Sequence, residues 1–469
     1  MALTGSLNND KSAKLESILF GLFLALIFWA PLPFGSNRGW SAAILMGVLF
    51  LIAVIWFAAL LCNRTCHPQA VFQKARYPLT LLIIIQCWVA LQLLPLPLEI
   101  IKLLSPRAAL LQGESSFIPL SLDTQATWLY LLKGLAYSVS FFLVIVLVNS
   151  RQRVESLLWM LILSGTFQAV YGCFMVLTGY EWGFFVEKYA NLGLATGTFV
   201  NRNHLAGYLV MSLAAGIGLL ISGTGGARLR NRRDRMRYPL ELMVSGKLML
   251  RILLALMVIG LIMTRSRMGN ISFFLSLTIA GAVALFIAKK FSWPLLLLLL
   301  SMLIVDTWLL GQWFGFDQVA TRIQQTVINE EQRTDVFQQT GSLVKDFPLT
   351  GSGGGSYYGL FEHYQNSQMA GFITHAHNDY LEITAELGVL GLMLFGVLVV
   401  LTSLRCLMLL RTESRLNRGI GFLTCMVIFW VLIHSLADFN LQIPANAMTL
   451  TVLLALAWIN PARAKAQSP

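Results

Sequence analysis

Residues 375–392 read HAHNDYLEITAELGVLGL, a polar half followed by an apolar half. The polar half holds His375, His377, Asp379 and Glu382, and the apolar half continues as a long hydrophobic segment. This change predicts a place where a polar loop re-enters a lipid bilayer. Ionisable side chains at a membrane boundary are costly in free energy, so they usually mark a functional site. The stretch therefore predicts both a membrane fold and the position of its chemistry.

The composition of the whole chain is typical of a protein embedded in a membrane. Of its 469 residues, 57% are hydrophobic and only 12% are charged. A bilayer can cover this much apolar surface, whereas a soluble protein of this size cannot bury it. Apolar segments recur along the chain, which predicts an all-α polytopic membrane protein. The first of them, residues 18–34, has no small-residue cleavage site, and we interpret it as a span rather than a signal peptide.

About 12 segments approach the roughly 20 residues that a helix needs to cross the hydrocarbon core. An outer loop between the ninth and tenth spans, residues 311–382, is far longer than an ordinary connection. The chain is thus divided into residues 1–310 with nine spans, this loop, and residues 383–469 with three spans and a tail. The predicted spans are 17–34, 42–62, 78–95, 128–149, 156–179, 204–222, 248–264, 271–288, 293–310, 383–404, 419–436 and 444–460.

The distribution of positive charge predicts the orientation of these spans. When the N-terminus is placed in the cytoplasm, most of the 34 Lys and Arg residues fall in cytoplasmic segments. Both termini are therefore predicted to be cytoplasmic. The net charge of +12 and the arginine cluster at 228–237 are explained by this topology and by anionic membrane lipids, so no nucleic-acid partner is predicted.

The long outer loop is predicted to fold as a partly helical lid over the bundle. Apolar residues spaced as on a helix run through 316–347, and Pro348 ends this segment. Residues 357–364 predict a second short helix. The glycine run 351–355 between them lacks the Lys-Ser/Thr pair of a nucleotide-phosphate loop, and we interpret it as a hinge or tight turn.

Arginines in the outer segments run against the general charge bias and are candidate phosphate ligands. Arg265 and Arg267 occupy a tight turn between two spans, and Arg202 lies at the head of another. A guanidinium group donates paired hydrogen bonds to phosphate and keeps its charge when partly dehydrated. Together these groups could hold a lipid-linked diphosphate at the membrane surface. The alternative is that they anchor the spans at the interface.

All histidines except His67 also map to outer loops or to outer ends of spans. An imidazole is a natural acceptor for the proton of a hydroxyl group, and His377 is our leading candidate for a general base. The alternative is a hydrogen-bonded structural histidine. A metal site of His375 and His377, completed by Asp379 or His363, is a weaker alternative because nothing fixes a third ligand. No metal or other cofactor is predicted.

The run His377-Asn378-Asp379-Tyr380-Leu381, followed by Gly388, is similar to the His-Asn/Ser-x-x-Leu…Gly motif of O-antigen ligases. The segments Pro348-Leu-Thr-Gly-Ser-Gly-Gly-Gly and Glu386-Leu-Gly-Val-Leu-Gly resemble the wider O-antigen ligase and polymerase superfamily. This resemblance extends over about two thirds of the chain, and the number of spans and the long outer loop agree with it.

The resemblance implies an integral-membrane glycosyltransferase of the bacterial inner membrane. Its donor would be a glycan on undecaprenyl diphosphate and its acceptor a hydroxyl at the periplasmic face, without nucleotide or metal. His377 would be the base, with Asp379 or Glu382 either orienting it or contacting sugar hydroxyls. The candidate ligands for the diphosphate are Arg265 or Arg267, with Arg202 and Arg333 as further candidates for phosphate or lid contacts. The candidate lid and glycan contacts are Gly353, Tyr357, His375, Asn378 and Tyr380.

Several acceptors fit the same chemistry. Lipid A–core would be the acceptor of a ligase, a growing glycan that of an O-antigen or exopolysaccharide polymerase, and a protein hydroxyl that of an oligosaccharyltransferase. A transporter is the alternative from a different class, and it should place ionisable groups at mid-membrane in paired broken helices. The polar groups here concentrate at one membrane face, which favours an enzyme that works beside membrane lipids.

Overall fold

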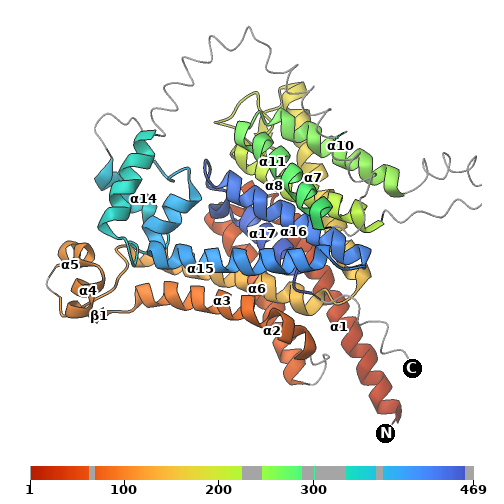
Figure 1. The fold of residues 1–469 in the computed structure, drawn as a ribbon, viewed down its shortest axis with the longest axis horizontal. Helices are drawn as coiled ribbons and strands as arrows, with labels where there is room; N and C mark the ends of the chain where they lie inside the picture. Colours follow the sequence, from red (N-terminus) through yellow and green to blue (C-terminus); the bar gives the residue numbers. More distant parts are fainter. Residues whose placement is uncertain are drawn as a thin grey trace, which may run out of the picture.

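The computed structural model describes residues 2–62, 69–113, 115–223, 246–287, 300, 334–365 and 373–459, without the side chains of 2–11, 69–71 and 246–247. These residues are mostly helical (Figure 1). The long helices are α1 (Ala2–Trp29), α2 (Gly39–Leu61), α3 (Gln69–Leu93), α6 (Thr124–Leu147), α7 (Arg151–Thr178), α8 (Arg202–Gly223), α10 (Gly246–Met263), α11 (Arg267–Ile287), α15 (Asp379–Leu410), α16 (Arg415–His434) and α17 (Pro444–Leu456).

Short elements form the connections between the long helices. The strands make two antiparallel pairs, β1 with β2 across the helices α4 and α5, and β3 with β4 in a short hairpin. The short elements are η1 (Phe34–Ser36), β1 (Leu96–Pro97), α4 (Leu98–Leu104), α5 (Pro106–Gln112), β2 (Phe117–Ile118), β3 (Trp182–Gly183), β4 (Val186–Glu187), a helix at 334–346, α14 (Tyr357–Leu360), η3 (Phe361–Tyr364) and η4 (Asn440–Gln442).

Within the described residues, nine helices are long and apolar enough to cross a membrane: α1, α2, α3, α6, α7, α8, α11, α15 and α16. Shorter apolar helices lie at residues 248–263 and 444–456, where two further spans were predicted. Of the predicted span 293–310, only residue 300 belongs to the described residues. The prediction of an all-α polytopic membrane protein is confirmed, and the number of 12 spans stays a prediction.

Two helix boundaries differ from the predicted ones for local reasons. Helix α1 ends at Trp29, five residues before the predicted end of its span, because Pro31 and Pro33 have no N–H group with which to continue it. Helix α15 begins at Asp379 because the Asn378 side chain caps it, with Oδ1 accepting a hydrogen bond from the Leu381 amide at 3.1 Å.

Helix α8 is the most enclosed of the spans, with 94% of its apolar window buried inside the protein. Its partner α16 approaches it closely, because a Cβ added to Gly419 would lie only 2.3 Å from the carbonyl oxygen of Gly218. Small residues allow the backbones of membrane helices to pack directly against each other. Figure 1 shows α16 and α17 in the middle of the molecule, beside α8.

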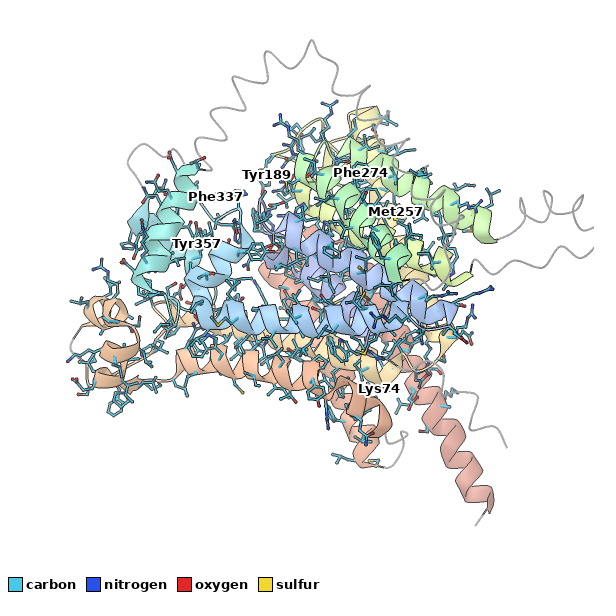
Figure 2. The ribbon with its side chains drawn as sticks, in the orientation of Figure 1. Lys74, Tyr189, Met257, Phe274, Phe337 and Tyr357 are labelled. Atoms are coloured by element: carbon cyan, nitrogen blue, oxygen red, sulfur yellow. The ribbon has the colours of Figure 1, made fainter. Side chains whose placement is uncertain are left out.

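A second, smaller hydrophobic core holds the connections together at one end of the bundle. It joins the segments 96–122 and 334–365 to the start of α15, through Ile101, Ala109, Ile118, Val336, Phe347, Tyr357 and Ala385. We call residues 96–122 and 334–365 the cap, and the end of the bundle that carries them the capped end. Figure 2 shows Phe337 and Tyr357 in the cap, apart from Met257 and Phe274 in the bundle.

Polar contacts also tie the two segments of the cap together. The Tyr364 hydroxyl donates a hydrogen bond to Asp346 Oδ2 at 2.5 Å, and Arg107 on α5 lies 3.4 Å from the same oxygen. Burial and the Asp346 carboxylate raise the pKa of Tyr364 to about 12, in keeping with a protonated hydroxyl that donates to this carboxylate. The helices predicted at 316–347 and 357–364 are present where the chain is described, at 334–346 and 357–364.

The opposite end of the bundle gathers segments that the charge distribution assigns to the cytoplasm. There Arg405 of α15 donates a hydrogen bond to the Ala457 carbonyl at 3.0 Å, just past the end of α17. Arg153 of α7 lies 3.8 Å from Glu16 of α1. The two ends thus separate the predicted outer and cytoplasmic segments, and the side of the membrane that each end faces stays a prediction.

Helix α15 is broken at Gly388, whereas the sequence predicts an uninterrupted span. The backbone of Gly388 has φ 71° and ψ 178°, a conformation that is essentially restricted to glycine. The turn before the break therefore cannot satisfy its carbonyl groups within the helix. In a membrane protein such groups need other donors, because lipid supplies none.

Donors from the cap and from α3 satisfy these carbonyls. The Ala385 carbonyl accepts from the Ser352 amide at 2.9 Å, and the Glu386 carbonyl accepts from the Gly353 amide at 3.0 Å. Trp88 Nε1 donates to the Leu387 carbonyl at 3.0 Å. The glycine run 351–355 is therefore a tight turn docked on the break in α15.

We expect Gly388→Ala to destabilise the protein by about 2 kcal/mol or more, because the substituted residue must keep a glycine-only conformation. In addition, its Cβ would lie 2.0 Å from the Leu349 carbonyl oxygen. The measurement is the melting temperature of the purified protein in detergent. Gly396→Ala in the same helix is the matched control, since a Cβ there meets nothing within 4 Å. Equal melting temperatures for the two variants would contradict this account of the break.

Candidate functional site

The motif at 377–381 is docked on the end of α16 and the connection that follows it. The Asn378 side chain donates to the Leu436 carbonyl at 3.1 Å, and the Asp379 amide donates to the Ser435 carbonyl at 3.0 Å. The Tyr380 hydroxyl donates to the Leu432 carbonyl at 2.8 Å. Three consecutive residues thus fix the start of α15 against a segment more than 50 residues away in the chain.

Phe439, in the connection between α16 and α17, brings three imidazoles together. The His375 ring stacks on Phe439 with centroids 4.2 Å apart and planes at 16°. His377 and His204 meet the same ring edge-on, at 4.9 Å and 4.8 Å. Because Phe439 is only 7% exposed, it acts as a shared internal support for these side chains.

A chain of buried amides fixes the connection that carries Phe439. Asn446, in the first turn of α17, donates to the His204 carbonyl at 3.0 Å and to Asn440 Oδ1 at 2.6 Å. Asn440 Nδ2 lies 3.0 Å from His434 Nδ1. The starts of α8 and α17 and the end of α16 are therefore coupled through polar side chains that are hardly exposed.

Glu382, in the first turn of α15, holds the loop that carries the histidines. Its Oε1 lies 2.8 Å from His375 Nδ1, and its Oε2 accepts a hydrogen bond from the Ala376 amide at 2.9 Å. The Glu382 side chain is 2% exposed, whereas that of His375 is 27% exposed. The carboxylate is thus internal, while the imidazole reaches the surface of the site.

The two acids predicted to orient His377 have other well-defined partners. Glu382 binds His375, and Asp379 Oδ2 accepts a hydrogen bond from Ser435 Oγ at 2.8 Å. Asp379 itself is 1% exposed. His377 is half-buried and has a left-handed backbone with φ 51°, which turns the chain sharply just before the Asn378 cap.

The predicted arginines lie at the same end of the bundle as the histidines. Arg202 begins α8, two residues before His204. Arg265, in the turn after α10, and Arg267, the first residue of α11, are both exposed. This turn is close to the start of α8, because a Cβ on Gly269 would lie 2.5 Å from the Ala206 side chain. The fold thus brings three of the four predicted arginines to the histidine end, and Arg333 lies outside the described residues.

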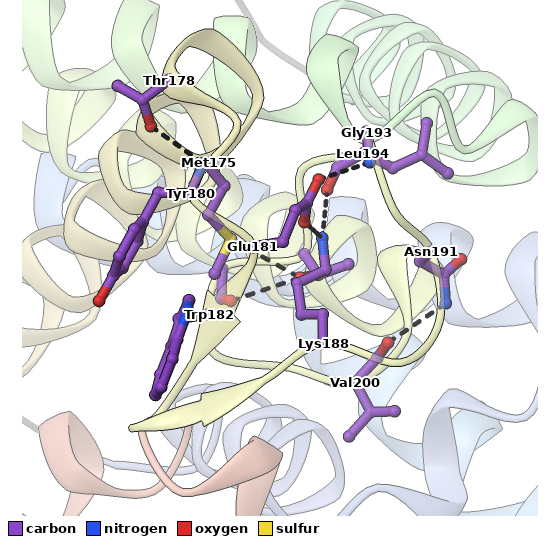
Figure 3. A network of polar contacts seen from close by, with 12 residues as sticks. Met175, Thr178, Tyr180, Glu181, Trp182, Lys188, Asn191, Gly193, Leu194 and Val200 are labelled. Carbon is purple, nitrogen blue, oxygen red and sulfur yellow. Dashed lines mark hydrogen bonds and ion pairs between the residues drawn. The ribbon is translucent and has the colours of Figure 1, made fainter.

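An ordered loop at 180–201 flanks the arginine turn. Lys188 forms an ion pair with Glu181 and donates to the Leu194 carbonyl at 3.1 Å (Figure 3). Glu181 also accepts from the Gly193 amide at 2.6 Å. Beyond this network, the Ala195 amide donates to the Met263 carbonyl at 3.2 Å, next to the arginine turn. In Figure 3 the rings of Tyr180 and Trp182 lie side by side, away from the ion pair.

Two predicted glycan contacts are internal to the cap. Tyr357 is 1% exposed, and its hydroxyl lies 2.9 Å from Thr340 Oγ1. Gly353 is buried, and a Cβ there would lie 2.4 Å from Ser121 Oγ. Their burial gives both residues a structural role in the cap, whereas His375, Asn378 and Tyr380 are partly exposed.

The segment 435–446, from the end of α16 into the first turn of α17, is the part of the site that sequence analysis missed. Only His434 at its edge was noted, although buried polar residues between two spans are a signal in themselves. The missed residues are Ser435, Asp438, Phe439, Asn440 and Asn446. Among the residues that the structure describes, no group of three or more His, Cys, Asp or Glu is arranged to hold a metal ion.

We expect Phe439→Ala to loosen the histidine loop, because it removes the ring that supports three imidazoles. The measurement is amide hydrogen exchange in residues 375–379, which should accelerate about tenfold or more as the loop opens more readily. Phe286→Ala, at an 89% exposed ring on α11, serves as the control and should leave this exchange unchanged. Unaltered protection in the Phe439 variant would show that the loop is ordered by other contacts.

Residues 252–396 match the family model described as O-antigen ligase. No curated protein matches the chain. The matched segment contains the arginine turn 265–267 and the histidines 375–377, whereas Arg202 and Phe439 lie outside it. The match confirms the resemblance predicted from the sequence and assigns residues 252–396 to the O-antigen ligase and polymerase superfamily.

Proposed function

We propose that this protein transfers a glycan from undecaprenyl diphosphate to an acceptor hydroxyl at the periplasmic face of the bacterial inner membrane. In this proposal the acceptor is lipid A–core, as for an O-antigen ligase. One observation carries the proposal: the segment that matches the ligase family contains both the arginine turn 265–267 and the histidines 375–377, and these lie at one end of the bundle.

The donor in this reaction already carries a good leaving group. Catalysis therefore requires mainly that the charge on the departing diphosphate is stabilised and that the acceptor loses its proton. Arg265 and Arg267 are suited to the first task, because they are exposed in a turn at the head of a membrane helix. Arg202 lies at the neighbouring helix start, and Arg333, which lies outside the described residues, is a further candidate ligand.

The second task falls to an imidazole of the segment 375–377, for which the family motif names His377. Both His375 and His377 contact Phe439, so either ring has a fixed support. Asp379, bound to Ser435, positions the motif rather than contacting the substrate. Asn378 and Tyr380 anchor the same turn to the end of α16, and their partly exposed edges are available to the glycan.

We expect cells that lack this protein to accumulate long glycan on the carrier lipid and to carry bare lipid A–core. Complementation with the wild type should restore the long lipopolysaccharide. His377→Ala should fail to do so, because loss of a group at the reacting centre lowers the rate about 10²–10⁴-fold. The measurement is a lipopolysaccharide gel run beside an analysis of the carrier-linked glycans.

Other patterns on this gel identify other functions. A carrier or core with a single repeat unit would identify a polymerase. Unchanged glycan pools in the deletion would contradict glycan transfer to either lipid acceptor and would favour transfer to protein or transport. A His377→Ala variant that complements fully would remove His377 from the reaction and leave the overall function standing.

We expect Arg265→Gln and Arg267→Gln to weaken donor binding, because each removes a charged hydrogen-bond donor from the phosphate site. Loss of one such contact corresponds to about a 10-fold or larger rise in the apparent KM for the lipid-linked donor. Arg411→Gln is the matched control, since Arg411 is an exposed arginine that ends α15 at the opposite end of the bundle. A rise in KM of the same size in all three variants would point to a general charge effect instead.

A further inference from the structure

The hairpin 182–187, within the loop 180–201, has a turn that its own sequence disfavours. Strands β3 and β4 are joined by only two residues, Phe184 and Phe185, whose backbones have φ 43° and 64°. A two-residue turn of this kind needs positive φ at both positions, and Asn, Asp or Gly is preferred there. A bulky side chain in the left-handed region strains the backbone, and such strain points to a functional contact. The two phenylalanines therefore need an interaction that offsets this strain.

Packing within the protein accounts for one of these two rings but not for the other. The Phe184 ring stacks on Trp40 with centroids 6.1 Å apart and meets Phe34 edge-on at 5.7 Å. Phe185, in contrast, is 86% exposed, so the protein leaves nearly all of this ring uncovered. The interaction that offsets the strain at Phe185 therefore lies outside the hairpin.

The hairpin connects two stripes of exposed apolar side chains, one on α7 and one on α2. Because both helices are long and apolar enough to cross a membrane, these stripes are the faces that lipid would cover. The Tyr171 hydroxyl of α7 donates to the Trp182 carbonyl at 2.7 Å and holds the stem of the hairpin on the first stripe. Phe184 stacks on Trp40, at the head of the second stripe. The stripes consist of Phe167, Val170, Phe174 and Leu177 on α7 and of Trp40, Ile44, Leu51 and Val54 on α2.

Arg38 and Tyr189 place polar groups beside the hairpin. Arg38 Nη2 donates a hydrogen bond to the Tyr189 hydroxyl at 3.4 Å, and the guanidinium carbon lies 5.5 Å from the centre of the Phe34 ring. Both side chains are exposed. Aromatic rings beside an arginine are typical of surfaces at the boundary between lipid headgroups and acyl chains, where the guanidinium group can contact phosphate.

We propose that the hairpin 182–187 docks on the phospholipid bilayer. Phe185 and Val186 lie among the acyl chains of the leaflet at the capped end, and Arg38 lies at the depth of the lipid phosphate groups. Burial of the Phe185 ring in lipid offsets the strain of its left-handed backbone. The hairpin then holds the loop 180–201 at a fixed depth, and the Ala195 amide of this loop is bonded to the Met263 carbonyl beside the arginine turn. This inference goes beyond the proposed glycan transfer and does not depend on it.

The other candidate partners of the exposed rings are a sugar, stacked on Phe185 or Tyr189, and the same hairpin of a second copy of this chain. The bilayer is favoured over both, because the hairpin continues lipid-facing stripes at its stem and at its tip. An experiment that identifies what touches Phe185 distinguishes the three partners.

The experiment uses the full chain in phospholipid nanodiscs, with the photoreactive residue p-benzoylphenylalanine in place of Phe185. After illumination we expect mass spectrometry to find a phospholipid adduct on the hairpin peptide. The same replacement of Phe286, an 89% exposed ring on the span α11, is the positive control and should also give a lipid adduct. Replacement of His363, exposed on η3 of the cap, is the negative control.

A second variant, Phe185→Asn, separates lipid contact from turn geometry, because the two predict opposite changes. Asn suits a left-handed backbone, so a better turn would make the hairpin open less often. Loss of the lipid contact makes it open more often. We expect hydrogen exchange of the Lys188 amide, which donates to the Glu181 carbonyl at 2.8 Å, to accelerate about threefold or more in nanodiscs. Phe185→Trp retains an apolar ring and should keep the wild-type exchange rate.

Two results would overturn the inference. One is an adduct of residue 185 with a glycan or a second protein chain, or no adduct at all, under conditions in which position 286 labels lipid. The other is slower or unchanged exchange of the Lys188 amide in Phe185→Asn, which would show that lipid does not hold the hairpin. Neither readout involves glycan transfer, so failure of the proposed function would leave both results interpretable.

Discussion

The structure depends on one constraint, namely that every backbone polar group in the membrane needs a partner from the protein. The helical hydrogen-bond pattern of α15 is interrupted at Gly388. The carbonyl groups before this break accept hydrogen bonds from the glycine turn 351–355 and from Trp88. The cap is therefore bonded to α15 through main-chain groups as well as through its own hydrophobic core. These hydrogen bonds fix the short segment of α15 that precedes the break. This segment begins within the motif 377–381 and therefore positions the motif in the site.

The same segment explains how buried acids are tolerated beside a membrane. Asp379, Glu382 and Glu386 lie on one face of α15 and are at most 2% exposed. Each accepts hydrogen bonds, from Ser435, from the Ala376 amide and from the Tyr357 amide respectively. The first turn of a helix also favours negative charge, because its unpaired N–H groups point toward it. Local donors thus stabilise Asp379 and Glu382 at the start of α15, and the cap supplies a donor to Glu386.

Sequence reasoning identified the parts of this arrangement that follow from local rules. Charge distribution and span periodicity indicated which segments share an end of the bundle, and the motif drew attention to residues 375–381 and 265–267. It missed contacts between distant segments, such as the bonds of Asn378 and Asp379 to residues 435 and 436. It also missed the Glu382–His375 pair, because residues seven apart meet only when the chain turns sharply, as it does at His377 with φ 51°. No periodic pattern encodes either feature.

The arginines of the site are more exposed than its histidines, and this difference would suit the proposed reaction between two lipids. Arg265 and Arg267 are exposed, so in the proposed reaction the diphosphate of a lipid-linked donor would reach them by lateral diffusion. The imidazoles lie deeper, around a Phe439 ring that is 7% exposed, and only His375 and His377 keep open edges. A proton acceptor sheltered in this way is reached by a hydroxyl of a bound acceptor more readily than by bulk water. In the proposed glycan transfer water would waste the donor by hydrolysis, so a sheltered base beside exposed phosphate ligands would favour transfer over hydrolysis.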